Sequence, residues 1–307
     1  MKIRCGTQIE ETEMNERFIG LQKENVIEIT AIDEKTIIED KHIMLFSEYL
    51  VEDELVIRNC FIEICGGGFM GGGGRLLIED CEIKDPISRL ISRDFKEATV
   101  RNTDIFWQDM FPCLRTADTD CELRLEGCRF DNPNLPEYEE GEEVGEICEI
   151  PVFKMPNARL KSCSFNGFPD MNVMLAAELC DCSFENCGLV TIAPDQDDED
   201  ERKLCGCEFN GISALSSVDC AIKKCRFTSC DCNGRSLVTT DSDVEDCEFS
   251  DVKLSNGAFA VLISGEAKVC GCKLEGVVTD RADGKILRGI KKGGFLGLKK
   301  IEYDPVG

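Results

Sequence analysis

Cysteine is the residue type in this sequence with the greatest capacity for chemistry, and its spacing is short and recurrent. Three cysteines fall within the ten residues "LCDCSFENCG" (179–188), and similar clusters follow in "LCGCEF" (204–209), "KKCRFTSCDC" (223–232) and "VCGCKL" (269–274). The chain has 21 cysteines in 307 residues. Thiols at such spacing could ligate a metal ion, form disulfides, or fill an apolar core as small side chains.

The ends and the hydropathy of the chain argue against a disulfide framework. The first residues, "MKIRCGTQIEETEMNERF", are too polar for a secretory signal peptide, and no run of about 18 apolar residues could span a membrane. We therefore expect a cytoplasmic protein whose thiols are kept reduced. The odd number of cysteines agrees with this expectation.

The charge of the chain restricts the class of partner. A formal net charge of -25 argues against nucleic acid, because phosphate binding depends on Lys and Arg, and it favours solubility. We expect no cofactor and no bound metal. The partner is expected to be a protein, or an acidic glycan, and the sequence does not name it.

An internal repeat gives most of the cysteines a position. It is anchored on ten residues, nine of them cysteine, spaced 18 to 35 residues apart: Cys60, Cys81, Thr103, Cys128, Cys163, Cys182, Cys207, Cys225, Cys247 and Cys272. An Ile, Phe or Leu stands two residues after every anchor, and an Ile, Val or Leu stands three residues before it. Alternation on both sides of the anchor is typical of strands with one buried face.

The residue immediately before the anchor indicates a kink between two strands. Eight of these ten residues are Asn, Asp or Gly, which tolerate left-handed backbone angles: Asn59, Asp80, Asn102, Gly127, Ser162, Asp181, Gly206, Lys224, Asp246 and Gly271. A third strand follows in several units, for example "GLVTIA" (188–193) and "FAVLIS" (259–264). The pattern predicts an all-β solenoid of about ten coils, in which each anchor points inward and the next residue points outward.

With this strand–kink–strand unit, the chain resembles the right-handed parallel β-helix of the pectate-lyase-like superfamily over about residues 50–280. The resemblance concerns coil geometry. It implies that the anchor cysteines stack about 4.8 Å apart as a ladder of buried thiols, which behave as small hydrophobic side chains. It also implies that enzymes acting on acidic glycans are among the proteins with this fold.

Three cysteines do not fit the ladder. Cys180, Cys205 and Cys270 lie two residues before an anchor, where most other units carry a charged residue, so we expect them to face outward. Cys180 and Cys205 are expected on consecutive coils, either as a redox or metal pair or as two partly covered thiols. In "CDC" and "CGC" the kink should turn the two sulfurs to different sides, which disfavours a four-sulfur zinc site.

The chain is expected to divide into three parts. Residues 1–50 form an N-terminal cap and first coil, with a capping helix in residues 9–24, and residues 51–280 form the coils. Residues 281–307 begin with a segment (281–300) of seven bases and one acid, net +6, which is expected to cover the open coil end; the alternatives are a docking tail for an acidic partner and a membrane-surface segment. The glycine-rich segment 66–74 is expected to be a flexible bulge between coils.

The glycan-active proteins implied by the resemblance direct attention to arginines and carboxylates. Arg93 and Arg115 each follow an anchor by twelve residues, so coils in register would stack their guanidinium groups, with Asp94 and Asp118 close in sequence. An acidic sugar or a phosphate could bridge the two arginines, and so could the two carboxylates. The fragment "NTD" (102–104) matches part of a polygalacturonase motif, but "GHG" is absent and His42 is the only histidine.

Three classes of function follow. The first is a non-catalytic β-solenoid that presents an extended surface for protein or ligand interaction. The second is a glycan-active enzyme, lyase- or hydrolase-like towards acidic polysaccharides, or a degenerate relative of one. The third is an acidic decoy that mimics DNA. We favour the first. The outward columns alternate in sign, which opposes a DNA mimic with one negative stripe, and the expected cytoplasmic setting opposes an enzyme that acts on polymers outside the cell.

Overall fold

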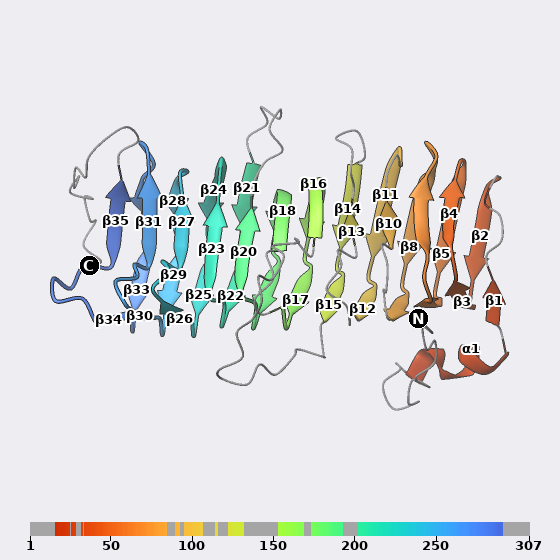
Figure 1. Ribbon diagram of the computed structural model, residues 1–307, viewed down its shortest axis with the longest axis horizontal. Coiled ribbons are helices and arrows are strands. Elements are labelled where there is room, and N and C mark those ends of the chain that lie inside the picture. The colour runs from red at the N-terminus through yellow and green to blue at the C-terminus, as the bar shows by residue number, and fades with distance from the viewer. Residues whose placement is uncertain are drawn as a thin grey trace, which may run out of the picture. The chain divides into compact units, whose positions relative to one another are not determined.

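Parallel strands stacked coil on coil make up nearly all of the described structure (Figure 1). The computed structural model describes residues 16–24, 26–28, 32, 34–84, 90–92, 95–106, 114–115, 122–131, 153–168, 173–192 and 202–290. These residues fall into two compact units, unit 1 (residues 1–134) and unit 2 (residues 135–307). Each unit is a parallel β-solenoid, which confirms the predicted all-β fold class.

The strands of unit 1 form three parallel ladders in which each strand pairs with the equivalent strand of the next coil. The first ladder is β2 (Thr36–Glu39), β5 (Glu54–Arg58), β8 (Arg75–Glu79), β11 (Glu97–Arg101) and β14 (Glu122–Glu126). The second is β1 (Val26–Glu28), β3 (His42–Leu45), β6 (Phe61–Ile64), β9 (Glu82–Lys84), β12 (Asp104–Phe106) and β15 (Arg129–Asp131). The third is β4 (Glu48–Val51), β7 (Gly68–Gly71), β10 (Ile91–Ser92) and β13 (Leu114–Arg115).

Unit 2 repeats this plan and adds a fourth short ladder. Two long strands, β16 (Phe153–Lys161) and β18 (Val173–Cys180), begin in the third ladder and end in the first. The first ladder continues with β21 (Arg202–Cys205), β24 (Cys220–Lys223), β28 (Val244–Glu245) and β32 (Val269–Cys270). The second is β17 (Ser164–Asn166), β19 (Ser183–Glu185), β22 (Glu208–Asn210), β25 (Arg226–Thr228), β29 (Glu248–Ser250) and β33 (Lys273–Glu275). The third continues with β20 (Leu189–Ile192), β23 (Ala214–Ser217), β27 (Val238–Thr240), β31 (Val261–Ser264) and β35 (Leu287–Ile290), and the fourth is β26 (Asp231–Asn233), β30 (Lys253–Ser255) and β34 (Val278–Thr279).

The kinks lie where the sequence predicts them. All ten residues that precede an anchor have positive φ, between 46° and 67°, including Ser162 and Lys224, whose residue types gave no signal. Asp40 has the same conformation (φ 53°) and marks a coil that the anchor alignment missed, because Lys41 stands where the other coils have Cys or Thr. Unit 2 has a second row of kinks four residues after each anchor: Gly167, Asn186, Gly211, Ser229, Asp251 and Gly276.

Eight of the nine anchor cysteines are buried, Cys272 in the last coil is half-buried, and their thiols are hydrogen-bonded to the backbone. The Cys60 thiol donates to the carbonyl oxygen of Arg58, 3.1 Å away and two residues earlier, and lies 3.7 Å from that of Ile38 on the preceding coil. The Thr103 hydroxyl donates to the Arg101 carbonyl oxygen at 2.7 Å, in the same position. A small inward side chain with a donor fits the position after these ten kinks, which accounts for both the cysteines and the single threonine in the anchor column.

Phenylalanine fills the core beside this column in unit 2. The rings of Phe165, Phe184, Phe209, Phe227 and Phe249 stack with centroids 4.8–5.0 Å apart and planes within 8° of parallel. All five side chains are at most 1% exposed. The residues of the last coil, Val269, Cys272 and Leu274, are only half-buried, as expected where a core column ends.

The predicted N-terminal helix is present but packs on the side of the coils. A short 3-10 turn (Glu16–Phe18) leads into α1 (Ile19–Glu24). The Phe18 ring lies 6.3 Å from that of Phe61, an outward-facing residue of β6, and both are fully buried. The described part of the helix thus covers an outward apolar side chain on the coil flank, whereas the sequence pattern suggested a cap over the open end.

The glycine-rich segment 66–74 is ordered, which corrects the expectation of a flexible bulge. Its middle forms β7, which pairs with β4 and β10. A Cβ atom on Gly67 would lie 1.8 Å from the carbonyl oxygen of Ser47, and one on Gly74 would lie 2.4 Å from that of Asp53. The glycines let the backbones of consecutive coils approach each other more closely than any side chain allows.

Candidate interaction surface

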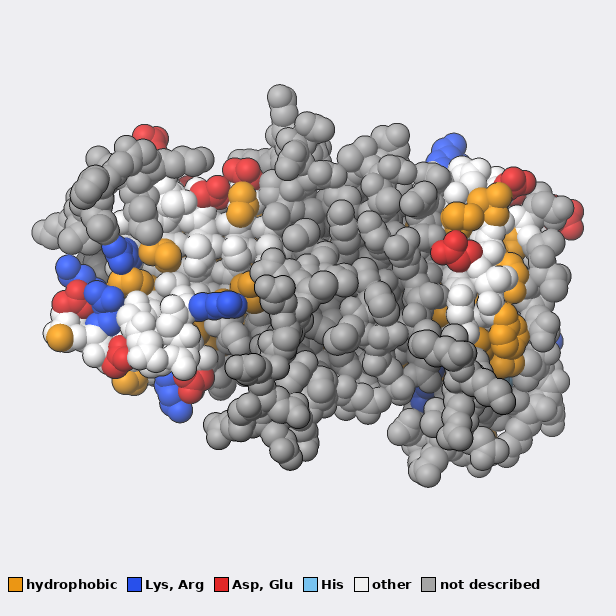
Figure 2. All heavy atoms as spheres, in the orientation of Figure 1, with side chains coloured by type: hydrophobic (Ala, Val, Ile, Leu, Met, Phe, Trp, Pro, Cys, Tyr) orange, Lys and Arg blue, Asp and Glu red, His pale blue; other side chains and the backbone are white. Residues whose placement is uncertain are grey.

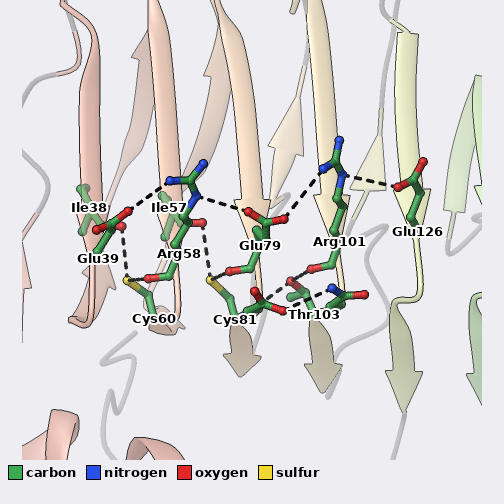
Figure 3. A network of polar contacts seen from close by, with 12 residues as sticks. Ile38, Glu39, Ile57, Arg58, Cys60, Glu79, Cys81, Arg101, Thr103 and Glu126 are labelled. Carbon is green, nitrogen blue, oxygen red and sulfur yellow. Dashed lines mark hydrogen bonds and ion pairs between the residues drawn. The ribbon is translucent and has the colours of Figure 1, made fainter.

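The outward face of the first ladder in unit 1 carries a row of charged side chains that alternate in sign. This charge ladder consists of Glu39, Arg58, Glu79, Arg101 and Glu126, one residue from each coil at the position two before the anchor. Figure 3 shows each arginine lying between the carboxylates of the coils before and after it. The N···O distances along the row are 3.2, 3.2, 3.8 and 3.4 Å.

The alternation has a physical cause. Strands of a parallel ladder place equivalent residues side by side, and like charges at that distance repel. With arginine and glutamate in turn, the repulsion becomes attraction, although each exposed pair contributes little to stability. The second ladder of unit 2 shows the same device in Glu208, Arg226, Glu248 and Lys273, where Lys273 Nζ lies 2.8 Å from Glu248 Oε1. Its ammonium group lowers the pKa of the Glu248 carboxyl.

Unit 1 exposes three large apolar side chains that lie near residues of the charge ladder along the chain. We define the apolar patch as Ile37 on β2, Phe46 in the turn after β3, and Leu50 on β4, which are 55%, 48% and 42% exposed. The patch lies on the first coils, and Figure 2 shows hydrophobic side chains gathered on this face of unit 1. Ile37 is exposed because β2 has a partner strand on one side only among the described residues, whereas its partner Val56 is 4% exposed.

A group of ionisable side chains lies buried on the flank of unit 1. His42 Nε2 lies 2.9 Å from Glu63 Oε2, and Lys84 Nζ lies 3.6 Å from Glu82 Oε1. The four side chains are 5%, 18%, 6% and 1% exposed, although they stand at outward positions of the second ladder. Phe61 lies between His42 and Glu82 in this ladder, so the group shares the flank that the N-terminal helix covers. The sequence pattern did not reveal this burial, because alternation alone assigns these positions to solvent.

The residues predicted to bind an anion are only partly described. Arg93, Asp94 and Asp118 lie outside the described residues, and for Arg115 only the backbone on β13 is described. The Cα partner of Arg115 on the preceding coil is Ser92, one residue short of Arg93, because the register of β10 and β13 does not follow the twelve-residue count. Anion binding by Arg93 and Arg115 stays a prediction.

The outward cysteines lie where the sequence predicts them. Cys180 and Cys205 are Cα partners on β18 and β21, and both are half-buried, while Cys270 on β32 is exposed. The cysteines that follow the kinks, Cys182 and Cys207, point inward and are buried. No disulfide joins two of the seventeen cysteines that the structure describes, and twelve of them are buried. Within the described ranges, no group of three or more His, Cys, Asp or Glu side chains is arranged to hold a metal ion.

Comparisons with known proteins do not assign the chain to a family. No family model matches the chain, and no curated protein matches it. One solved structure that the chain matches is that of HetL, a pentapeptide repeat protein involved in heterocyst differentiation regulation from the cyanobacterium Nostoc sp. strain PCC 7120. It is 12% identical, and the match covers 69% of this chain and 92% of that chain with a TM-score of 0.19. Among the described residues, no helix is long and apolar enough to cross a membrane.

Proposed function

We propose that this protein is a non-catalytic β-solenoid that presents the outward face of unit 1 to a protein partner. The observation that carries the proposal is the apolar patch, three large side chains that are 42–55% exposed on the first coils. On soluble proteins, apolar surface that gathers on one region often marks a site of protein interaction. Apolar side chains near a polar, charged border are also typical of protein–protein interfaces.

The charge ladder supports a binding role over a catalytic one. Each arginine of the ladder already contacts two carboxylates, so the ladder offers a neutralised, regular surface and not a single activated group. The buried ionisable group on the flank has side chains at most 18% exposed, which hinders contact with a polymeric glycan. The alternation in sign also opposes the DNA-mimic alternative, which requires a continuous negative stripe.

Two finer expectations belong to this proposal. The relation to pectate-lyase-like β-helices concerns coil geometry, and it is supported by the repeated strand–kink–strand unit and the in-register ladders. A cytoplasmic location is the second expectation, and it is supported by an arrangement in which cysteines fill the core as small buried side chains.

Site-specific photo-crosslinking in the cells that make the protein tests the proposal. A photoreactive amino acid is introduced at Ile37 or Leu50, and at Thr239, an exposed residue of β27 in unit 2, as the control position. We expect the same protein adduct from positions 37 and 50 and none from position 239. The variant Ile37→Asp/Leu50→Asp should fold and lose that partner. Absence of adducts at 37 and 50, or equal adducts at all three positions, would contradict the proposal.

A further inference from the structure

Two adjacent thiols interrupt an outward column of charged residues in unit 2. The column runs Lys161, Cys180, Cys205 and Lys223 on consecutive coils, each residue being the Cα partner of the next. We call these four residues the thiol row. The equivalent positions of unit 1 hold the charge ladder, so a pair of cysteines stands where unit 1 has a carboxylate–arginine pair.

The two thiols of the row are accessible and separated from the buried thiol ladder. Cys180 and Cys205 are both half-buried, free and outward-facing, while Cys182 and Cys207 lie at most 1% exposed on the other side of the kink. The Cys180 thiol lies 3.8 Å from the Glu178 carboxylate on its own strand. Among the described residues no third His, Cys, Asp or Glu side chain completes a metal site here, so an ion bound between Cys180 and Cys205 would be held by the two sulfurs.

The coil spacing determines what can join the two sulfurs. The rings of Phe184 and Phe209, which follow Cys180 and Cys205 by four residues, are related by a 5.0 Å step with planes 6° apart, so these two coils are close to translated copies. Equivalent side-chain conformations would then separate the sulfurs by about the strand spacing of ~4.8 Å. A disulfide requires Cβ atoms about 3.5–4.5 Å apart, which is shorter than this step. Two thiolates in line on one metal ion, with bonds no longer than the ~2.3 Å of a zinc–thiolate bond, lie up to about 4.6 Å apart, which is close to this step.

We propose that Cys180 and Cys205 form a two-coordinate site for a soft monovalent cation, Cu(I). Thiolates select soft ions of this kind, and a linear bis-thiolate geometry matches one coil step. In the binding step two thiols release their protons to solvent, two Cu–S bonds form, and no electron is transferred. The complex carries one negative charge, and Lys161 and Lys223 occupy the neighbouring positions of the row, although Lys223 also pairs with Glu245 at 3.0 Å.

The test is a Cu(I) titration of the full-length, reduced protein without oxygen, in competition with a chromogenic Cu(I) chelator. Wild type is compared with Cys180→Ser, Cys205→Ser, the double variant, and Cys270→Ser as the matched control. Cys270 stands in the same outward column, but its Cα partner is Glu245, so it has no second thiol beside it. Circular dichroism confirms that each variant is folded.

The expected results separate the pair from the other cysteines. Wild type and Cys270→Ser should bind one more Cu(I) ion per chain than the double variant. In each single variant the affinity for this additional ion should fall by roughly 100-fold or more. X-ray absorption should show a two-sulfur copper site that disappears in the double variant. A double variant that binds as much Cu(I) as wild type would overturn the proposal, and so would loss of the same equivalent in Cys270→Ser. An intramolecular 180–205 disulfide formed readily with glutathione disulfide would contradict the spacing on which the proposal rests.

Discussion

At the residue scale, Arg58 shows what the outward columns require. Its guanidinium group lies 3.2 Å from both Glu39 and Glu79, so Arg58→Glu would place three carboxylates in adjacent coils. We expect this variant to lose about 1–2 kcal/mol of unfolding free energy at low salt, because two attractions become repulsions. Urea unfolding monitored by circular dichroism measures the loss.

The control for this prediction is Arg58→Gln, which removes the attraction without adding repulsion and should cost less. Salt provides a second control, since exposed charges are screened within about 3 Å at 1 M ionic strength. The difference between the Glu and Gln variants should therefore shrink in 1 M NaCl. A cost that is equal for both variants and independent of salt would mean that the ladder contributes through packing and not through charge.

Sequence reasoning worked best for residues whose backbone conformation restricts the residue type. Asn, Asp and Gly at eight kinks predicted left-handed φ, and the structure confirms it there and shows the same conformation at Ser162 and Lys224. Counting residues from the anchor did not give the strand register farther along the coil. Arg115 pairs with Ser92 and not with Arg93, because the length of the segment that precedes the third strand varies between coils. It also missed the buried flank group, since the burial of His42 and Glu82 depends on a helix distant in sequence.

At the element scale, the stacked phenylalanines of unit 2 should contribute strongly to stability. Phe209 is fully buried between Phe184 and Phe227, with centroids 5.0 and 4.9 Å away. Phe209→Ala should cost about 3–5 kcal/mol, as truncation of buried Phe does. Phe46→Ala, at a side chain that is 48% exposed, should cost less than about 1 kcal/mol. Similar costs for the two variants in denaturant unfolding would refute the assignment of Phe209 to the core.

The glycines of segment 66–74 have two different roles that substitution can separate. A Cβ on Gly67 would lie within 2.5 Å of three backbone atoms of Ser47, whereas Gly73 has a left-handed φ of 86° and nothing within 4 Å of its Cβ position. Gly73→Ala should cost about 1–2 kcal/mol from its backbone angle alone. Gly67→Ala should cost clearly more, because backbone must move. Equal melting temperatures for the two variants would show that the close approach of the coils is not required.

The composition of this segment led to the wrong expectation for a physical reason. Glycine-rich stretches are flexible when they are solvated, and the sequence gives no sign that a neighbouring backbone lies against them. In the structure β7 has a strand on each side, so its amide groups are paired within a ladder. The same segment can be flexible in the unfolded chain and ordered in the folded one, because only in the folded chain do the neighbouring coils pair with it.

At the scale of the whole molecule, the buried thiols should make stability depend on alkaline pH. Burial raises the pKa of Cys187 and of Cys230 to about 11, and that of Cys232 to about 12, from a value of 9.0. A raised folded-state pKa contributes stability that is complete below the unfolded pKa and is lost as pH rises through the folded one. The unfolding free energy should therefore fall between about pH 9 and pH 11, by up to about 1.4 kcal/mol per pH unit for each thiol.

A matched variant isolates the thiol contribution from that of other groups that titrate in this range. Val252 stands in the column of Cys187 and Cys230 and is fully buried, so valine fits this position. Cys187→Val/Cys230→Val should lose less stability than wild type between pH 9 and pH 11 in urea unfolding under reducing conditions. An identical pH dependence for the two proteins would mean that these thiols ionise as easily in the folded state as in the unfolded one.

The most direct test of the account is a residue-by-residue map of thiol reactivity, obtained by alkylation of the native, reduced protein and mass spectrometry. The anchor cysteines line the core, whereas Cys180, Cys205 and Cys270 face outward. We expect these three to be alkylated first, slowly at neutral pH because burial and nearby carboxylates raise the pKa of Cys180 and Cys270. The twelve buried cysteines should react only after unfolding. Alkylation of native Cys182 or Cys207 as fast as Cys180 would contradict the central claim that the repeated cysteines build the solenoid core.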